Sequence, residues 1–447
     1  MLDKNPAAPG VNVPNDLAAH WMPFTANRAF KKAPRLLAGA KDMHYITVDG
    51  RKIIDAAAGM WCCNAGHGRA QISSAIAKQA EALDYAPPFQ FGIPQAFELA
   101  SRIAELAPDG LDHVFFCNSG SEAADTALKI ALAYHQLNGQ GGRTRLIGRV
   151  RGYHGVGFGG TAVGGIVNNR KIFGSLLAGV DHLPATYDRE KQAFSKGEPD
   201  YGAHFADELE NLVNLHGANT IAAVMVEPMA GSTGVIPAPK GYLKRLREIT
   251  QKHGILLIFD EVITGFGRTG QAFAAETFGV VPDIMTMAKA LTNGVIPMAA
   301  VAVREDVQQT ILDAAPADSV EFYHGYTYSA HPVACAAALA TLNIYREENI
   351  FAQVRDLTPA FLEQIGAFKG MDGVVDTRGF GLLGAVEIAP VGKPGERGFK
   401  ILRRAFEEGL VLRAAGDSIV LAPPFVATAD EISKMIDIIR KLVKETA

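Results

Sequence analysis

The chain has 447 residues, of which 48% are hydrophobic and 20% are charged, and its formal net charge at pH 7 is -4. This is the composition of a globular protein whose length exceeds one compact core, so two or three domains are expected. The slightly acidic charge and the lack of a basic block argue against nucleic acid as the main partner. No apolar run approaches the length that crosses a bilayer, and no apolar segment of a signal peptide is evident.

The N-terminal part contains three recognisable segments. Residues 1–19 are rich in Pro, Asn and Ala and predict an extended arm. The segment HWMPF at 20–24 is an aromatic cluster that either anchors this arm or forms part of a pocket wall. Residues 45–55 alternate around an Asp-Gly pair, which predicts a β-hairpin with a two-residue turn. Trp61 follows in a glycine-rich loop and is either a core plug or a pocket lid.

The middle of the chain alternates between strand and helix patterns. Helical spacing is found at 71–83, 96–106, 121–137 and 242–253, and short apolar strand runs are found at 113–116, 145–148, 221–226, 255–259 and 284–288. Such alternation is typical of an α/β fold with a doubly wound parallel sheet. An Ala-rich helix follows Pro332, and then come strands at 382–388 and 418–421 and a closing helix at 429–445. The expected domains are an N-terminal arm with part of the small domain at 1–70, a large domain at 71–333 and a C-terminal small α+β domain at 334–447.

Two of the predicted strands end in residues that can perform chemistry. The run 255–259 is followed by Asp260, and the run 284–288 is followed by Lys289. Because ligands of open α/β sheets bind at the carboxyl ends of the strands, we expect the acid and the amine in one crevice. Pyridoxal phosphate requires such a pair, a lysine for its Schiff base and an acid for its pyridinium nitrogen. Taken singly, each residue is more simply interpreted as a turn cap or a solvated strand end.

A phosphate-binding segment would strengthen the hypothesis that Asp260 and Lys289 bind pyridoxal phosphate. The residues after the strand at 113–116 are a candidate for such a segment. Ser119, Gly120 and Ser121 fall at the start of the next predicted helix, and Ser119 with Glu122 fits the capping-box pattern S-x-x-E. Free backbone N–H groups and the helix dipole favour an anion there. A helix cap needs no phosphate, so this signal is weak alone and gains weight from Asp260 and Lys289.

Two glycine-containing motifs have less certain meanings. In RGYHG at 151–155, either Tyr153 or His154 could stack on a planar cofactor, or the motif could be a turn with a buried tyrosine. GFGRTG at 265–270 matches the dinucleotide fingerprint G-x-G-x-x-G. Its distance from the preceding strand and the lack of a helix at the turn indicate an accidental match.

The strings NSGSEA, RGYHG, VEPMAG, FDEVITGFGRTG, MAK and HGYTYSAHP occur in an order and spacing that resemble the class III aminotransferases of pyridoxal-phosphate fold type I. The resemblance extends from HWMPF to RAAGD and is strongest with ω-amino acid and amine:pyruvate aminotransferases, including β-alanine:pyruvate transaminase. It implies a large domain with a mainly parallel seven-stranded sheet and a smaller α+β domain.

The resemblance also implies roles for individual residues. Lys289 would be the catalytic lysine that links to the cofactor, and Asp260 would pair with the pyridinium nitrogen. The other expected cofactor-binding residues are Ser119, Gly120, Ser121, Tyr153, His154, Glu227, Val262 and Thr327. Because Thr327 would reach the phosphate of the neighbouring subunit, a homodimer or a dimer of dimers with active sites at the interface is implied. Substrate would contact Phe24, Trp61, Phe89, Tyr153 and Arg413.

One departure from the family pattern bears on the amino acceptor. Members that use 2-oxoglutarate often have an acid after VEP, which pairs with an arginine at the position of Arg378; here that acid is replaced by Ser232. Arg413 instead matches the mobile arginine of the amine:pyruvate subgroup, which grips a carboxylate and swings aside for an uncharged amine. Pyruvate is therefore favoured over 2-oxoglutarate.

The resulting hypothesis is a pyridoxal-phosphate-dependent transaminase. It would move the amino group of an ω-amino acid or primary amine such as β-alanine to pyruvate, giving an aldehyde or ketone and L-alanine. The alternatives are a 2-oxoglutarate-dependent aminotransferase, an aminomutase or racemase on the same scaffold, and a nicotinamide oxidoreductase that rests on GFGRTG alone. The four cysteines, Cys62, Cys63, Cys117 and Cys335, have no metal-site spacing, so no metal and a reducing cytoplasmic setting are expected.

Overall fold

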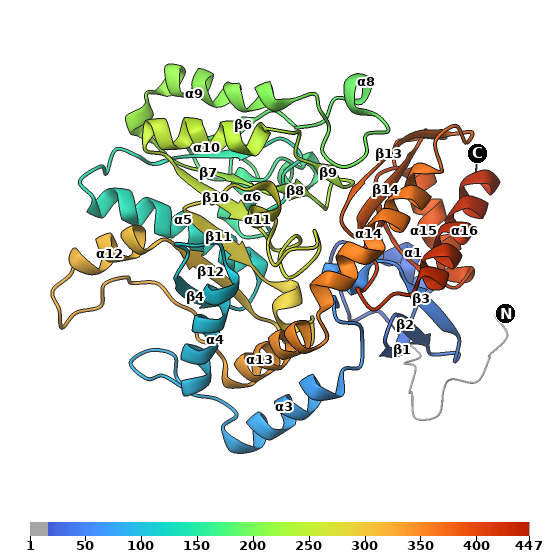
Figure 1. The fold of residues 1–447 in the computed structure, drawn as a ribbon, viewed down its shortest axis with the longest axis horizontal. Helices are drawn as coiled ribbons and strands as arrows, with labels where there is room; N and C mark the ends of the chain where they lie inside the picture. Colours follow the sequence, from blue (N-terminus) through green and yellow to red (C-terminus); the bar gives the residue numbers. More distant parts are fainter. Residues whose placement is uncertain (1–16, 447) are drawn as a thin grey trace.

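The computed structural model describes residues 17–446, so the predicted arm at 1–19 lies almost wholly outside the described residues. A seven-stranded sheet forms the centre of the larger part of the molecule (Figure 1). Its strand order is β4 (His113–Cys117), β12 (Ala299–Val303), β11 (Ile284–Met287), β10 (Leu256–Asp260), β7 (Ile221–Val226), β5 (Arg145–Arg149) and β6 (Val180–Leu183). All neighbouring pairs are parallel except those that β12 makes with β11 and β4.

The central strands are apolar throughout because both faces of the sheet are covered. In β10, Leu256 and Ile258 belong to the core on one face, while Leu257 and Phe259 belong to the core on the other. The first core is shared with α5 (Gly120–Leu137) and α12 (Glu305–Asp313), and the second with α9 (Glu208–His216) and α10 (Tyr242–His253). Two-sided burial explains why these strands appear in the sequence as continuous rather than alternating apolar runs.

The register of β10 and β11 places the ends of these strands side by side. The two strands are parallel, and Asp260 lies opposite Thr286. Lys289 follows β11 and begins the short 3-10 helix η3 (Lys289–Thr292). The acid and the amine predicted from the sequence therefore leave the sheet at the same edge.

The C-terminal residues form a second, antiparallel sheet. Its order is β13 (Val374–Phe380), β14 (Leu383–Ile388), β17 (Ser418–Leu421) and β16 (Arg413–Ala415). The helices of this part are α14 (Ile350–Gly366), α15 (Glu396–Glu407) and α16 (Ala429–Glu445), and α13 (Pro332–Glu347) precedes them and packs on α3 (Ala70–Ala82) and α4 (Pro94–Leu106).

The N-terminal strands lie beside this C-terminal part (Figure 1). β1 (Leu37–Lys41), β2 (His44–Thr47) and β3 (Lys52–Asp55) form a sheet whose fourth strand is β15 (Leu410–Val411), parallel to β3. The remaining helices are α1 (Asn27–Lys32), α2 (Ala58–Trp61), α6 (Phe158–Val163), α7 (Val167–Arg170), α8 (Arg189–Gln192), α11 (Ala274–Phe278), η1 (Ala203–Asp207) and η2 (Ala218–Thr220), and β8 (Met229–Ala230) pairs with β9 (Ile236–Pro237). The domain boundaries at 70 and 333 stay a prediction.

The predicted α/β fold with a mainly parallel seven-stranded sheet is confirmed, and most predicted elements agree with the structure within two residues. β6 and β12 were not predicted: β6 is an edge strand that contains Asp181 and His182, and β12 is rich in alanine, which has a low strand propensity. The predicted hairpin is present, but β2 ends at Thr47 and β3 begins at Lys52, so the prediction of a two-residue turn was wrong. The backbone N–H of Arg51 donates to Thr47 Oγ1 at 3.0 Å, which closes a longer turn.

The GFGRTG segment does not have the strand–turn–helix geometry of a dinucleotide-binding motif. It is a series of turns, and the next helix, α11, begins only at Ala274. Arg268 in its middle is fully buried and donates to the carbonyl oxygens of Leu382 and Pro423 and to Asn64 Oδ1. The segment thus links the large sheet to the C-terminal part.

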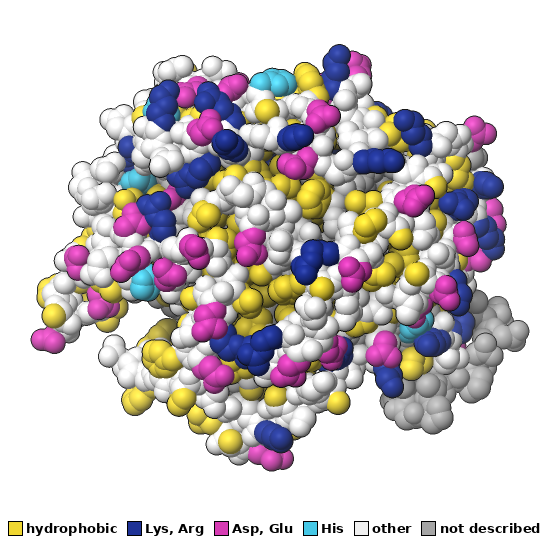
Figure 2. Space-filling view, in the orientation of Figure 1, with side chains coloured by type: hydrophobic (Ala, Val, Ile, Leu, Met, Phe, Trp, Pro, Cys, Tyr) yellow, Lys and Arg dark blue, Asp and Glu magenta, His cyan; other side chains and the backbone are white. Residues whose placement is uncertain are grey.

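Among the helices of residues 17–446, none is long and apolar enough to cross a membrane. On the face drawn in Figure 2, Lys and Arg side chains are interspersed with Asp and Glu. This mixed surface agrees with the small net charge of -4.

Gly148 in β5 offers a test of how tightly the sheet packs beneath α6. A Cβ at this position would lie 1.8 Å from the carbonyl oxygen of Val163. We expect Gly148→Ala to lower the free energy of unfolding by about 1–3 kcal/mol, because the backbone of α6 must move. Gly366, at the end of α14, has open space at the Cβ position, so Gly366→Ala serves as the control and should leave the melting temperature unchanged or raise it. Equal melting temperatures for the two variants would contradict this packing.

Candidate active site

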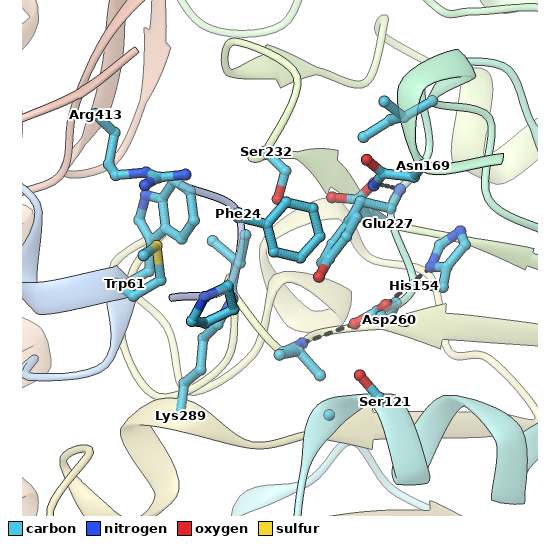
Figure 3. A pocket seen from close by; sticks show the side chains of 18 of the residues that line it. Phe24, Trp61, Ser121, His154, Asn169, Glu227, Ser232, Asp260, Lys289 and Arg413 are labelled. Atoms are coloured by element: carbon cyan, nitrogen blue, oxygen red, sulfur yellow. Dashed lines mark hydrogen bonds and ion pairs between the residues drawn. The ribbon is translucent and has the colours of Figure 1, made fainter. Parts of the chain in front are cut away.

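A cavity of about 490 Å³ lies at the strand edge where Asp260 and Lys289 emerge. Asp260 and His154 lie on one side of it, and Trp61 and Arg413 lie on the other (Figure 3). The predicted site residues that line this cavity are Phe24, Trp61, Gly120, Ser121, Tyr153, His154, Glu227, Asp260, Val262, Lys289 and Arg413. They come from segments spread over nearly the whole chain, as expected for a site at the carboxyl edge of an α/β sheet.

Hydrogen bonds fix the carboxylate of Asp260. Its Oδ2 accepts from Nδ1–H of His154 at 2.8 Å, and its Oδ1 accepts from the backbone N–H of Val262 at 3.1 Å and from Thr286 Oγ1 at 3.3 Å. His154 is buried, and an ionised carboxylate can only accept, so the proton lies on Nδ1 of the imidazole. These three donors fix the orientation of the Asp260 side chain, which lines the cavity.

Lys289 enters the cavity from a strained position. Its φ is +51°, a left-handed conformation that is uncommon for residues other than glycine. Its Nζ lies 5.0 Å from the ring centroid of Trp61. Burial lowers the pKa of the amine, an effect that the nearby thiol of Cys62 and the carboxylates of Asp260 and Glu227 oppose. A lysine with a lowered pKa is suited to act as a nucleophile and as a base.

The N-terminus of α5 forms another wall. Ser119 is the N-cap, and its side chain accepts from the backbone N–H of Glu122 at 3.2 Å, whereas the Glu122 carboxylate accepts from Asn118 rather than from Ser119. The predicted capping box is therefore only half present. Gly120 and Ser121 line the cavity, while the side chain of Ser119 serves as the cap. A Cβ on Gly120 would lie 3.0 Å from Val262 Cγ1, so glycine allows the start of the helix to approach Val262 closely.

Tyr153 and His154, the two aromatic residues of the RGYHG loop, have different positions in the site. His154 lies behind Asp260 and bonds to it, so it is not free to stack, and Tyr153 remains as the aromatic wall. The backbone N–H of Tyr153 donates to Glu227 Oε1 at 2.9 Å, and Gly231 donates to Oε2 at 3.2 Å. Burial raises the pKa of Glu227. Glu227 thus ties the tyrosine loop to the segment that follows β7.

The two arginines singled out from the sequence have different environments. Arg378 is buried and donates to Asp376 Oδ2 at 2.5 Å, to Glu387 Oε2 at 2.7 Å and to the backbone oxygens of Gly234 and Val235. Arg413, from β16, lines the cavity, and its Nε has no hydrogen-bond partner among residues 17–446. Burial lowers the pKa of its guanidinium. Only Arg413 is available to an anion in the cavity.

Three predicted site residues do not line this cavity: Ser119, whose side chain caps α5, Phe89 and Thr327. Phe89 contacts a second hollow of about 270 Å³, next to His324 and Gly325. The backbone oxygen of Thr327 accepts from the hydroxyl of Tyr85 at 3.0 Å. Phe89 and Tyr328 are exposed, so this region presents aromatic rings to the surroundings of the chain.

Several residues that line the cavity were not among the predicted site residues. Pro23, Thr25, Met60, Gly155, Ile166, Asn169, Ser232 and Ile263 all do so. Ile166 and Asn169 lie at the short helix α7, where no periodic pattern or motif marks them. Ser232 was noted only for the acid that it replaces. Within residues 17–446, no group of three or more His, Cys, Asp or Glu side chains is arranged to hold a metal ion.

The residues present fit pyridoxal phosphate. The carboxyl group of Asp260 suits a protonated ring nitrogen, and the buried amine of Lys289 suits an aldehyde carbon. The open N-terminus of α5 at Gly120 suits a phosphate. These three groups surround a single cavity (Figure 3).

Comparisons with known proteins agree with this geometry. Residues 25–443 match the family described as aminotransferase class-III. The chain is 54% identical to an omega-aminotransferase of Caulobacter vibrioides over 96% of its own length and 98% of the relative, and 49% identical to a beta-alanine–pyruvate aminotransferase of Pseudomonas aeruginosa over 96% of each. The solved omega transaminase from Pseudomonas jessenii in complex with PMP superposes with a TM-score of 0.91 at 32% identity and covers 96% of both chains.

A family match over almost the whole chain, combined with a lysine, an acid and a helix N-terminus around one cavity, establishes the class of protein. The predicted resemblance and the predicted cofactor are confirmed. The chain belongs to the class-III aminotransferases and is a pyridoxal-phosphate-dependent transaminase.

Proposed function

We propose that this enzyme transfers the amino group of an ω-amino acid or primary amine, such as β-alanine, to pyruvate, giving an aldehyde or ketone and L-alanine. The names of relatives 54%, 49% and 48% identical, an omega-aminotransferase and two that act on β-alanine or ω-amino acids with pyruvate, support this substrate class. A 37% identical relative is a putrescine–pyruvate aminotransferase, which also uses pyruvate.

The observation that carries the choice of pyruvate is the contrast between the two arginines. Arg378 is neutralised by Asp376 and Glu387 outside the cavity, whereas Arg413 is unpaired in it. A dicarboxylate such as 2-oxoglutarate needs a second cation, and Arg378 would have to break two buried ion pairs to provide it. Pyruvate needs one guanidinium only. Ser232, in place of an acid, leaves that side of the cavity without a negative charge.

The cofactor-binding roles follow from the position of each residue. We assign the covalent link to the cofactor to Lys289 and the hydrogen bond from the protonated pyridine nitrogen to Asp260. Tyr153 and Val262 would pack against the two faces of the cofactor ring. The assigned phosphate contacts are the N-terminus of α5 at Ser119, Gly120 and Ser121. His154 and Glu227 hold Asp260 and the tyrosine loop in place.

When bound, pyridoxal phosphate carries the amino group between the two substrates and accepts the electrons released when a proton leaves the substrate carbon. Lys289 Nζ takes that proton and returns it at the neighbouring position, as general base and then general acid. Burial lowers the pKa of this amine, which favours the unprotonated form that can accept a proton. Asp260, held by three donors, preserves the positive charge of the ring nitrogen. Phe24, Trp61 and Tyr153 form an apolar wall around the reacting groups.

We also propose a homodimer, or a dimer of dimers, in which Thr327 and Phe89 complete the cavity of the other protomer. Both residues lie away from the cavity of their own chain, beside exposed aromatic rings that a second copy would cover. A cytoplasmic location is proposed because all four cysteines are free thiols.

The substrate assignment is tested by a scan of donors and acceptors. We expect the purified enzyme with added pyridoxal phosphate to form alanine from pyruvate and β-alanine, with GABA, putrescine and 1-phenylethylamine as further donors. Exchange of pyruvate for 2-oxoglutarate should lower the rate by at least about 10-fold, because Arg413 is the only arginine of residues 17–446 that lines the cavity. A faster reaction with 2-oxoglutarate would overturn the choice of acceptor.

The role of Lys289 is tested by Lys289→Ala. We expect loss of turnover and of the visible absorbance that depends on attachment of the cofactor to the lysine, because no other amine among the described residues lines the cavity. Lys78→Ala removes an exposed lysine from α3 and should change neither property. Retention of activity and colour in Lys289→Ala would refute the assignment.

The role of Arg413 is tested by Arg413→Ala in reactions that start from the loaded enzyme and a donor without acceptor. A charged hydrogen bond contributes about 1.5–3 kcal/mol, so the rate with β-alanine should fall about 10- to 100-fold. The rate with neutral 1-phenylethylamine should change much less. Arg403→Ala, which removes an exposed arginine from α15, is the control. A uniform loss with both donors would mean that Arg413 has a structural role.

A further inference from the structure

Arg149 is a buried cation that joins the ends of two neighbouring strands. It is the last residue of β5, is only 1% exposed, and donates from Nη2 to the backbone oxygen of Glu227 at 2.9 Å. Glu227 directly follows β7, which pairs with β5 in the central sheet. Its carboxylate accepts from the backbone N–H of Tyr153 at 2.9 Å. Two hydrogen bonds, one to the backbone and one to the side chain of Glu227, therefore link the segment after β5 to the segment after β7.

Tyr153 belongs to a loop whose backbone is strained. The φ of Arg151, two residues earlier, is +67°, a left-handed conformation that is uncommon for residues other than glycine. A strained segment keeps its shape only where the surrounding structure enforces it. The bond from Tyr153 to Glu227 is a contact of this kind, and it lies at the residue whose ring lines the cavity.

The carboxylate of Glu227 is buried beside another acid and depends on positive charge nearby. It is 4% exposed and lies on the same side of the cavity as Asp260 and His154 (Figure 3). Burial raises the pKa of Glu227, and the negative charge of Asp260 adds to this effect, whereas positive charge on His154 and Arg149 opposes it. A guanidinium keeps its charge at every physiological pH, and an imidazole does not. Arg149 is therefore the permanent cation among these neighbours of Glu227.

Stability of the fold does not explain a charge at position 149. Arg149 Nη1 has no hydrogen-bond partner in the described part of the chain, so part of the buried guanidinium is unsatisfied. Burying a charge costs desolvation energy, and apolar residues of similar volume are often neutral or stabilising in its place. A role towards Glu227 does explain the charge, because Arg149 bonds to the backbone of this residue and offsets the charge of its carboxylate.

We propose that Arg149 is a positioning residue that holds Glu227 in place and, through it, keeps the ring of Tyr153 packed against the cofactor. Arg149 is not among the described residues that line the cavity, so it acts through these two residues and touches neither cofactor nor substrate. The inference rests on the proposed function, since it takes from it the assignment of Tyr153 to one face of the cofactor ring.

Arg149→Met tests the inference, because methionine is unbranched and apolar and removes both the charge and the donors. The probe is pyridoxamine phosphate, which has no aldehyde and cannot link to Lys289, so its dissociation constant reports the non-covalent contacts alone. We expect equilibrium dialysis of the loaded proteins to give a constant about 5- to 10-fold higher for Arg149→Met, the effect of a lost aromatic contact. Inorganic phosphate, which occupies only the N-terminus of α5, should compete with equal affinity in both proteins.

Two further substitutions separate the charge of Arg149 from its shape. Arg149→Lys keeps the charge and should bind pyridoxamine phosphate within about 2-fold of the unaltered enzyme. Arg149→Gln keeps a donor for the backbone of Glu227 but has no charge, and it should weaken binding about 5- to 10-fold, as methionine does. This neutral, polar variant also provides the test if Arg149→Met does not fold.

Arg397→Met is the matched control. Arg397 is 3% exposed and, like Arg149, donates to backbone oxygens, here those of Ala389 and Val443 in the C-terminal part. Its replacement removes a buried guanidinium far along the chain from the tyrosine loop and should leave the dissociation constant of pyridoxamine phosphate unchanged within about 2-fold. Equal weakening in Arg397→Met and Arg149→Met, or a parallel loss of phosphate affinity in Arg149→Met, would overturn the inference.

Tyr153→Ala separates a failure of the inference from a failure of the proposed function. It should weaken binding of pyridoxamine phosphate at least as much as Arg149→Met, because it removes the ring itself. No effect of Tyr153→Ala would overturn the assignment of the ring face and the inference with it. An effect of Tyr153→Ala without one of Arg149→Met or Arg149→Gln would overturn the inference alone. Because no donor or acceptor enters these measurements, a failure to form alanine from β-alanine and pyruvate would overturn only the proposed substrates.

Discussion

The parallel register of β10 and β11 is the constraint on which the site depends. It places Asp260, the last residue of β10, opposite Thr286 of β11. Lys289 follows Thr286 by three residues, so both side chains lie at the same edge of the sheet. The imidazole of His154 then orients the Asp260 carboxylate through a hydrogen bond of 2.8 Å between Nδ1 and Oδ2. A shift of one residue in this register would turn Asp260 to the opposite face of the sheet and separate it from Lys289. Burial of both sheet faces specifies the register, because the four apolar residues of β10, at 256–259, alternate between two cores.

Much of the fold could be predicted because its strands are apolar on both faces. The ends of β7 and of α10 agree with the patterns in the sequence, since glycine, charged residues or breaks in periodicity mark them. β6 and β12 were missed because a polar edge strand and an Ala-rich run lack that signal. The reversed direction of β12 cannot be read from composition, because it depends on which neighbours the strand meets in space.

The residues of the site likewise fall into those that could be predicted from the sequence and those that could not. Residues at strand ends and helix starts, such as Asp260, Lys289 and Gly120, could be located because the topology of an α/β sheet brings such positions together. Ile166 and Asn169 could not, because they reach the cavity from the N-cap and the body of the four-residue helix α7, which is too short to show a periodic pattern. The roles of Tyr153 and His154 were open in the sequence, and the hydrogen bond of His154 to Asp260 distinguishes them. The pairing of Arg378 with Asp376 and Glu387 likewise required three-dimensional coordinates.

The pairing of β3 with β15 has a consequence for the order in which the enzyme is built. The backbone N–H of Ile54 donates to Gly409 and that of Ala56 to Val411, each at 2.8 Å, so the segment that leads into Trp61 is bonded to residues more than three hundred positions later. A ribosome that has synthesised the central sheet has therefore not yet made the strand that holds this wall of the cavity. Contacts so distant in sequence close slowly, because the entropy of the intervening chain must first be lost. The nascent chain can thus fold its α/β core early, but it acquires a complete catalytic cavity only after nearly all of it has been translated.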